Sequence, residues 1–214
     1  MGKEVDLLVN YPKSKRNIKV RNEAKSDEHR EIARTFGKQY FDGDRSFGYG
    51  GYRYNPRFWE PVIPSFADYY LLNNGQNILD VGCGKGFMLY DMSRLVPGIK
   101  VRGLDISQYA FENALEDIRS FIDVGNATDL PYNNNSFDLV ISINTIHNLE
   151  KNDCIIALKE IERVSKGNSF VVVDAFRNDE EEKRINEWNL TALTYLHVNE
   201  WVDLFNDAGY SGDY

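Results

Sequence analysis

The sequence predicts a doubly wound α/β fold, in which helices cover both faces of a mostly parallel sheet. Between residues 77 and 173, short apolar runs of strand length alternate with segments whose apolar residues recur at helical spacing. The runs are apolar along nearly their whole length, which is typical of strands that are buried on both faces. Strands that alternate with helices in this way indicate a parallel sheet between two helical layers.

Five strands are expected in order, at 77–81, 100–105, 122–124, 137–143 and 169–173. The first helix covers residues 87–96, where Pro97 and Gly98 end it. Ser107 is a good N-cap for a second helix that runs to about Phe121. A third helix is expected from Asp153 to Ser165, with its apolar residues on the inner side.

Length and composition set outer limits on the function. A chain of 214 residues fits one domain that buries about 70% of its unfolded surface, and no apolar run approaches the roughly 20 residues that cross a bilayer. The beginning Met-Gly-Lys-Glu-Val-Asp lacks the apolar core of a signal peptide. Two cysteines, Cys83 and Cys154, give no disulfide framework and fit a reducing compartment. We therefore expect a cytoplasmic protein that has no membrane segment.

Charge is distributed unevenly along the chain. Residues 1–45 have a net charge of +3, and residues 46–214 have a net charge of −11. The net negative charge of residues 46–214 would repel a phosphate backbone. A nucleic-acid substrate is therefore disfavoured unless the N-terminal arm supplies the contact. The basic residues of the arm are interpreted as a solvated tail, or else as a docking site for an anionic substrate or partner: Lys13, Lys15, Arg16, Lys19 and Arg21.

A glycine-rich loop follows the first strand, with the sequence Asp80-Val-Gly-Cys-Gly-Lys-Gly86. Its glycines permit positive φ and close approach of a ligand, and the next helix offers its N-terminal amides. A dinucleotide fingerprint requires glycine where Phe87 stands, and a Walker loop requires a longer lead from its first glycine. The spacing is instead Gly-x-Gly-x-Gly after an acidic residue.

These residues resemble the first motif of the class I S-adenosylmethionine-dependent methyltransferases. The resemblance continues at the next strand ends and covers roughly residues 75 to 175, through Gly103-Leu-Asp-Ile-Ser107, Gly125-Asn-Ala-Thr-Asp-Leu-Pro-Tyr132 and Asn135-Ser-Phe-Asp-Leu-Val140. It implies a Rossmann-like methyltransferase fold with S-adenosylmethionine as the cofactor. The ligand of such a sheet lies at the carboxyl ends of the strands, at the point where the winding reverses.

The resemblance also implies roles for individual residues. Asp80 and the backbone of Gly82 and Gly84 would hold the amino-acid tail, and Asp105 would accept hydrogen bonds from the ribose hydroxyls. The remaining cofactor residues are expected along the adenine and the strand ends: Cys83, Ile106, Asn126, Ala127 and Asn144. The Cys83 side chain occupies a variable position and is expected to serve packing or spacing. Asn126 stands where relatives often carry Asp, and a simple turn residue is the alternative.

His147 is the predicted catalytic base, because it follows the fourth strand and the pKa of histidine lies near neutrality. A structural histidine is the alternative, and Asp174 after the fifth strand is the reserve candidate, with helix capping as its own alternative. Three histidines and two cysteines show no metal-ligand spacing, so we expect no metal.

The segment from Arg45 to Trp59 combines glycines with aromatic residues, and we expect a lid whose walls include Tyr49, Tyr52 and Tyr54. Packing of an N-terminal helix onto the sheet is the alternative. The expected organisation is an N-terminal arm and lid over residues 1–60 and a cofactor-binding domain over residues 61–214. Trp188 and Tyr195 are further candidates for the wall of the acceptor pocket.

The antiparallel hairpin that usually ends such sheets is expected to be truncated, because only Tyr210-Ser-Gly-Asp-Tyr214 follows the last helix. The N-terminal arm is an alternative cover for that edge, and a homodimer would be another consequence of an open edge. The predicted function is methyl transfer to a small anionic or sugar-like acceptor, with O-methylation favoured and a resemblance to enzymes of bacterial surface-polysaccharide pathways. The alternatives are an RNA methyltransferase that uses the basic arm and a cofactor-binding protein without catalysis.

Overall fold

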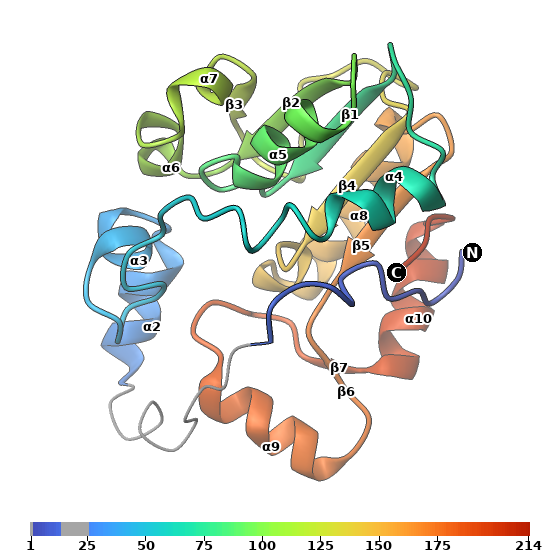
Figure 1. The fold of residues 1–214 in the computed structure, drawn as a ribbon. Coiled ribbons are helices and arrows are strands. Elements are labelled where there is room, and N and C mark those ends of the chain that lie inside the picture. The colour runs from blue at the N-terminus through green and yellow to red at the C-terminus, as the bar shows by residue number, and fades with distance from the viewer. Residues whose placement is uncertain (1, 14–25) are drawn as a thin grey trace.

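The computed structural model describes residues 2–13 and 26–214 and confirms the predicted doubly wound fold. Five parallel strands form the central sheet in the order β3-β2-β1-β4-β5 (Figure 1). Their bounds are β1 Asn77–Val81, β2 Lys100–Asp105, β3 Ile122–Val124, β4 Leu139–Ile143 and β5 Ser169–Val172. The chain winds outward from β1 to β3 and then returns to the other side of β1 with β4. The winding therefore reverses between β1 and β4, where a ligand site is expected.

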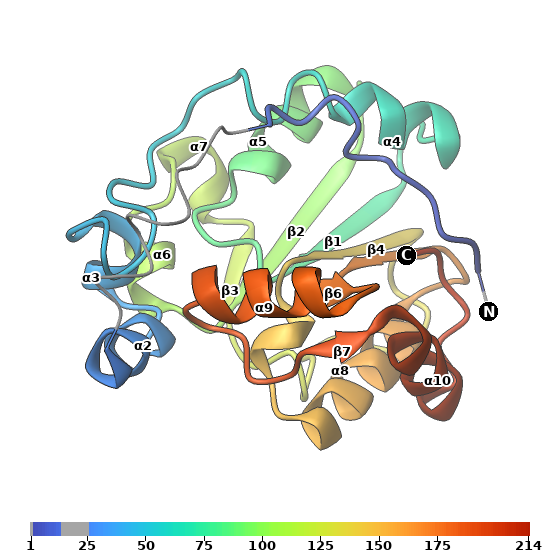
Figure 2. The same cartoon turned by 90° about the horizontal axis from the view of Figure 1, so that it is seen from below.

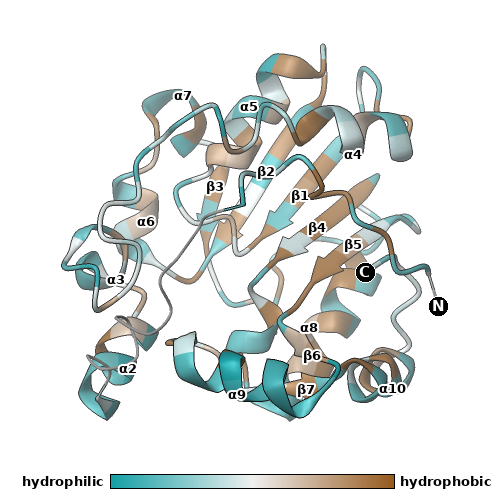
Figure 3. Cartoon of the chain, turned by 60° about the horizontal axis from the view of Figure 1, so that its bottom comes forward, coloured by the Kyte–Doolittle hydropathy of each residue, from teal (hydrophilic) through white to brown (hydrophobic). Residues whose placement is uncertain are grey.

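Helices cover both faces of this sheet. One buried cluster joins inward residues of α4 (Ile63–Tyr69), α5 (Phe87–Leu95) and α7 (Glu116–Arg119) to one face. The other cluster joins α8 (Lys151–Val164) and α10 (Val198–Ala208) to the opposite face. Strands β1, β4 and β5 are mostly apolar and buried, as expected for a sheet that is covered on both sides, whereas β2 and β3 also contain exposed residues such as Lys100 and Val124 (Figure 3).

Several element bounds differ from the sequence prediction by one or two residues, and one expected helix is divided. The helix expected from Ser107 to Phe121 is divided into α6 (Gln108–Glu112) and α7, because Leu115 has an extended backbone with ψ of 140°. This break lets Ile118 of α7 enter the core, where it is 1% exposed. The fourth strand begins at Leu139, since Phe137 forms only an isolated bridge with Ser165.

Several elements lie over the carboxyl ends of the strands (Figure 2). They are α2 (Asp27–Arg34), α3 (Lys38–Asp42), the short helix η1 (Ile146–Asn148), β6 (Ala175–Phe176), α9 (Asp179–Trp188) and β7 (Leu196–His197). The two-residue strands β6 and β7 pair in parallel, and α9 lies between them in the sequence. Helix α9 is strongly polar, and most of its residues face solvent (Figure 3). These additions enclose the end of the sheet at which the strands finish.

Both chain ends cover the edge of the sheet beside β5. Asp213 forms a parallel bridge with Phe170, its N–H donating to the Ser169 carbonyl and its own carbonyl accepting from Val171. Tyr214 in turn donates to the Lys3 carbonyl and accepts from the Val5 N–H. The described residues thus contain no antiparallel hairpin at this edge, and the N-terminal residues serve as its outer cover, which was the alternative considered above.

Candidate active site

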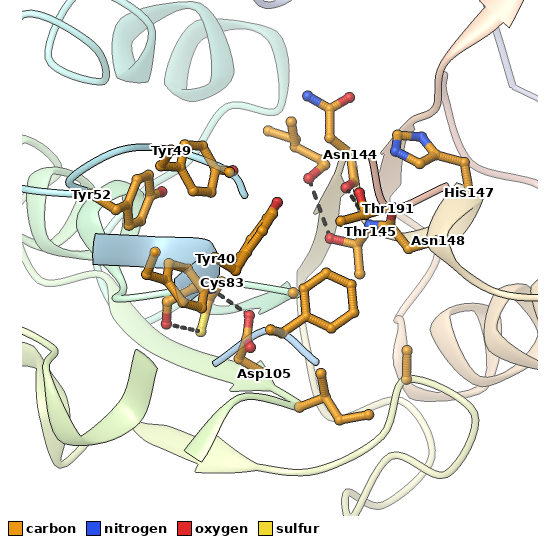
Figure 4. A pocket seen from close by; sticks show the side chains of 18 of the residues that line it. Tyr40, Tyr49, Tyr52, Cys83, Asp105, Asn144, Thr145, His147, Asn148 and Thr191 are labelled. Carbon is orange, nitrogen blue, oxygen red and sulfur yellow. Dashed lines mark hydrogen bonds between the residues drawn. The ribbon is translucent and has the colours of Figure 1, made fainter. Parts of the chain in front are cut away.

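A cavity of about 380 Å³ lies at the carboxyl ends of the strands (Figure 4). Its size is that of a small-molecule site. Of the thirteen residues predicted for the cofactor, the catalytic base and the lid, twelve line it: Tyr49, Tyr52, Asp80, Gly82, Cys83, Gly84, Asp105, Ile106, Asn126, Ala127, Asn144 and His147. The thirteenth, Tyr54, does not belong to the lining. The structure therefore brings almost the whole predicted site together around the switch point.

The glycine loop follows β1 in a left-handed backbone. Gly82 has φ of 85° and Gly84 has φ of 56°. A Cβ atom at Gly82 would collide with the Thr145 side chain from the end of β4, so this position requires glycine for both backbone and space. Cys83 packs its buried side chain against Gly103, and burial raises the pKa of its thiol well above the ordinary value. A packing role for the Cys83 side chain is consistent with this environment.

Asp105 closes β2 and holds the glycine loop. Its carboxylate accepts a hydrogen bond from the Gly84 N–H at 2.6 Å and another from the Ser107 N–H at 2.9 Å. Burial raises the pKa of this carboxyl, and the two backbone donors oppose that rise. Each oxygen has one further lone pair available for a ligand donor.

Asp80 is a buried carboxyl on the wall of the cavity, 5% exposed. Burial, and then the nearby charge of Asp105, raise its pKa to about 7. A bound cation such as an ammonium group would relieve both effects, because it stabilises the ionised carboxylate. Asp80 therefore has the chemistry of a site for an amino group.

Beyond Asp105, the cavity has an apolar wall and a polar turn. Ile106 is 55% exposed although it is a large aliphatic residue, and it lies at the cavity. The Asn126 amide oxygen accepts from the Thr128 N–H at 3.1 Å, so it forms the turn that the alternative interpretation foresaw. Its second lone pair and the Ala127 backbone stay beside the cavity.

Asn144 follows β4 with φ of 56°, a backbone that Asn adopts more readily than most residues. Its N–H donates to the Val172 carbonyl and its carbonyl accepts from the Asn148 side chain. The Asn148 side-chain oxygen is buried and has no partner within the described residues. Asn148 lines the cavity, so this oxygen marks a place where a ligand donor would be stabilising.

His147 and Asp174 lie together at the ends of β4 and β5. The His147 Nδ1 accepts a hydrogen bond from the Asp174 backbone N–H at 2.9 Å, and its Nε2 is 3.7 Å from the Asp174 carboxylate. The ring is 3% exposed, and burial lowers its pKa although the Asp174 charge raises it. The Asn189 side chain donates to the same carboxylate oxygen at 3.0 Å. Helix capping, the alternative for Asp174, is not seen, since Asn178 caps α9.

The aromatic segment forms one wall of the cavity. The rings of Tyr49 and Tyr52 are 4.4 Å apart, and Tyr52 stacks on Phe87 at 4.9 Å. Tyr54 points elsewhere, because its hydroxyl donates to the buried Asp91 carboxylate of α5 at 2.5 Å. That bond explains why Tyr54 is absent from the lining: it fixes the aromatic segment to α5.

A second connection joins this segment to the glycine loop. The Lys85 ammonium lies 2.6 Å from the Asp42 carboxylate and also donates to the Tyr52 carbonyl. Asp42 accepts further bonds from the Tyr109 hydroxyl and the Tyr52 N–H. Burial alone would raise the pKa of Asp42, but these donors outweigh it and hold the pKa below its ordinary value.

Several lining residues were not identified from the sequence. They are chiefly aromatic residues from before β1 and polar residues from the loop after α9: Tyr11, Tyr40, Trp59, Asn189 and Thr191. No local motif marks them. Of the two residues considered for the acceptor wall, Trp188 lines the cavity and Tyr195 does not.

Fold and site together define a class I methyltransferase domain that uses S-adenosylmethionine. The residues present fit this cofactor: Asp80 suits its ammonium, Asp105 its ribose hydroxyls and Ile106 its adenine. The family profile described as "Methyltransferase domain" matches residues 72–209, so the chain belongs to that family.

Curated relatives share the domain but carry different names. The chain is 32% identical over 144 residues to the tRNA (carboxymethyluridine(34)-5-O)-methyltransferase of Arabidopsis thaliana, covering 66% of this chain and 33% of that protein. It is 29% identical over 144 residues to the malonyl-acyl-carrier-protein O-methyltransferase of Legionella pneumophila, covering 65% and 49% respectively. The chain thus spans half or less of the length of these relatives.

A solved structure agrees in fold. The Haemonchus contortus phosphoethanolamine N-methyltransferase 2, in complex with S-adenosylhomocysteine, matches with a TM-score of 0.59 at 19% identity and covers 83% of this chain and 44% of that one. Within residues 2–13 and 26–214, no helix is long and apolar enough to cross a membrane. The same residues contain no cluster of acidic, His and Cys side chains that could hold a metal ion.

From the sequence, the basic arm is interpreted as a tail or a docking site. Four of its five residues lie outside the described residues, namely Lys15, Arg16, Lys19 and Arg21.

Proposed function

We propose that this chain transfers a methyl group from S-adenosylmethionine to a small polar acceptor. The observation that carries the proposal is the convergence of the glycine loop, Asp80 and Asp105 on a cavity that continues to His147 and Asp174. The first set would bind the cofactor, and the second would contact the acceptor. When bound, the cofactor supplies an electrophilic methyl group on a sulfonium.

The charges of the cavity favour a neutral, sugar-like acceptor over an anionic one. Asp80, Asp105 and Asp174 all line it. Within the described part of the chain, Arg45 is the one Lys or Arg of the lining, and its guanidinium donates to the Tyr49 carbonyl. Asp80 and Asp105 are assigned to the cofactor, so an acceptor would meet mainly the Asp174 carboxylate, and this charge favours a neutral acceptor over an anionic one. A hydroxyl acceptor fits the polar ends of β4 and β5, so O-methylation is the favoured reaction.

The wall formed by Tyr49 and Tyr52 supports a lid over residues 45–59, with Tyr54 and the Lys85–Asp42 pair as its attachments. Aromatic faces near a sulfonium would also contribute a cation–π attraction of roughly 0.5–2 kcal/mol. The domain boundary near residue 60, a homodimer, a cytoplasmic location and a role in polysaccharide pathways stay predictions.

An RNA methyltransferase is the second candidate, supported by the similarity to the Arabidopsis thaliana tRNA enzyme. The acidic body opposes it, since a phosphate backbone would meet net negative charge. A cofactor-binding protein without catalysis is the third possibility.

A screen for S-adenosylhomocysteine release tests these alternatives, with nucleotide sugars, phosphorylated sugars and RNA as acceptors. The expected result is turnover with an acceptor that offers a sugar hydroxyl. Calorimetry on the same protein should show that it binds the cofactor. Turnover only with RNA, together with steeply salt-dependent binding, would favour the second candidate. Cofactor binding without product from any acceptor would favour the third, and absence of cofactor binding would contradict all three.

A further inference from the structure

The hydrogen bond from the Asp174 backbone decides which nitrogen of His147 carries the proton. A backbone N–H is a donor in every protonation state, so Nδ1, 2.9 Å away, must offer its lone pair. A neutral imidazole has one protonated nitrogen and one lone pair. Neutral His147 therefore carries its proton on Nε2.

This tautomer has a consequence for proton transfer. The single lone pair of neutral His147 is occupied by the Asp174 N–H, and Nε2 already bears a hydrogen. To accept a substrate proton, the ring would have to give up its backbone bond inside a site where it is 3% exposed. Loss of that bond would also leave the part-buried Asp174 N–H without this partner, which costs free energy.

The Asp174 carboxylate has the opposite character. The backbone of Asp174 is fixed on both sides. Its N–H donates to His147, and its carbonyl accepts a hydrogen bond from the Trp201 indole at 3.1 Å. One carboxylate oxygen accepts from Asn189 at 3.0 Å and lies 3.7 Å from the His147 Nε2. The side chain is 21% exposed and lines the cavity, so the carboxylate can still accept hydrogen bonds from a ligand.

We propose that Asp174 is the group that receives the acceptor's proton, and that His147 is a positioning residue locked in its Nε2–H form. This inference rests on the proposed function. With a hydroxyl acceptor, a carbon–oxygen bond forms while the carbon–sulfur bond of the sulfonium breaks and its electron pair stays on sulfur. The hydroxyl proton passes to the Asp174 carboxylate and from there to solvent. His147 positions Asp174 through the bond from the Asp174 backbone N–H to Nδ1, and its Nε2 lies 3.7 Å from the Asp174 carboxylate.

Histidine NMR tests the locked tautomer without any acceptor. Protein labelled with ¹⁵N-histidine has three residues to assign, His29, His147 and His197, and the spectrum of His147→Gln identifies the signal of interest. At pH 7.5 the expected pattern for His147 is a protonated Nε2 and an unprotonated Nδ1. A protonated Nδ1, or a doubly protonated ring at that pH, would overturn the proposal.

Kinetics test the role of Asp174 once the screen has found an acceptor. Asp174→Asn is expected to lower kcat by about 10²–10⁴. The affinity of this variant for S-adenosylhomocysteine should stay within about threefold of the wild-type value. This measurement checks that the cofactor-binding residues are still correctly folded. His147→Asn offers an amide oxygen to the Asp174 N–H, so it is expected to lower kcat by no more than about tenfold.

The reverse ranking, with His147→Asn severely impaired and Asp174→Asn active, would return the role of base to His147 and overturn the proposal. Failure of the proposed function has a different signature, namely a wild-type protein that binds no S-adenosylhomocysteine. If the protein binds this product but no acceptor is found, the NMR result alone decides whether His147 can accept a proton.

Discussion

The Lys85 ammonium lies 2.6 Å from the Asp42 carboxylate and joins the glycine loop to the segment that covers it. Lys85 occupies a position of the loop that the motif leaves variable, and Asp42 lies at the end of α3. The Lys85 side chain is 6% exposed and that of Asp42 is 23% exposed, so the pair is shielded from most of the solvent. The cofactor loop and the aromatic segment are thus coupled by a charge pair and by the Tyr52 backbone.

Lys85→Met is expected to lower the free energy of unfolding by about 1–3 kcal/mol. Removal of one partner from a fully buried pair costs more, but Asp42 keeps its bonds from Tyr109 and Tyr52 and part of its hydration. Thermal unfolding measures the loss, and hydrogen exchange over residues 45–59 of the S-adenosylhomocysteine-bound protein should become faster. The exposed Lys38 of α3, changed to Met, is the matched control. Equal stability of the two variants would contradict a coupling role for Lys85.

Affinity for S-adenosylhomocysteine should depend on pH through Asp80. The free site has a pKa of about 7 for this carboxyl, and the ligand's ammonium binds the ionised form. Affinity should therefore fall as the pH drops below 7, by at most about tenfold per pH unit for one proton. Calorimetry between pH 5.5 and 8 measures the slope. Asp80→Asn should bind weakly and lose the slope, and an unchanged slope in this variant would assign the proton to another group.

The same carboxyl should affect the stability of the ligand-free protein in the opposite direction. A folded-state pKa above the unfolded value means that the folded chain binds the extra proton. The stability due to the protonated form is fully present below pH 4 and is lost as the pH rises toward 7. Asp80→Asn should remove this decline, which denaturant unfolding at several pH values can measure.

Asp105→Ala should weaken binding of S-adenosylhomocysteine by about 10- to 150-fold, equivalent to roughly 1.5–3 kcal/mol. Two losses would contribute, because Asp105 is proposed to bind the ribose hydroxyls and its carboxylate accepts a hydrogen bond from the Gly84 N–H. Asp105→Asn separates them: its amide oxygen can keep one backbone bond, while the charge is gone. Titration calorimetry on folded variants gives both constants. Normal affinity in the alanine variant would remove Asp105 from the cofactor site.

Local patterns were sufficient to predict the sheet and most of the residues from the strand ends that line the cavity. Strands such as 77–81 and 169–173 are mostly apolar, and the glycine loop resembles the first motif of one family. Parallel topology then places the strand ends together, which explains why Asp80, Asp105 and His147 line one cavity. These predictions depend on residues close in sequence and on a sheet whose order is constrained.

The unpredicted features depend on pairs that are distant in sequence. Nothing near Asp42 indicates that its partner is Lys85, and nothing near His147 shows that its ring will accept from the Asp174 backbone. The division between α6 and α7 also arises from tertiary packing of Ile118, which overrides a continuous helical pattern. Side-chain roles such as base or positioning residue follow from such pairs, so a motif could locate His147 but not assign its chemistry.

The lid proposal makes opposite demands on Tyr49 and Tyr54. Tyr49 is 39% exposed on the cavity wall, whereas the Tyr54 hydroxyl donates to the buried Asp91. Tyr49→Ala should leave the melting temperature of the ligand-free protein within a few degrees and weaken S-adenosylhomocysteine binding by about 3- to 30-fold. Tyr54→Phe should do the reverse, because it removes a hydrogen bond from a buried carboxyl and leaves the cavity intact.

Thermal unfolding and calorimetry on both variants separate a lid from a structural core. A buried core aromatic would lose about 3–5 kcal/mol on truncation to alanine, which appears as a large fall in melting temperature before any ligand is added. Hydrogen exchange gives an independent measure: in a lid, amides of residues 45–59 exchange fast in the free protein and slowly when ligand is bound. Slow exchange in both states, together with strong destabilisation by Tyr49→Ala, would assign the segment to the scaffold. Protection that appears only with ligand, and that Tyr49→Ala reduces, is the result expected of a wall that closes over the cofactor.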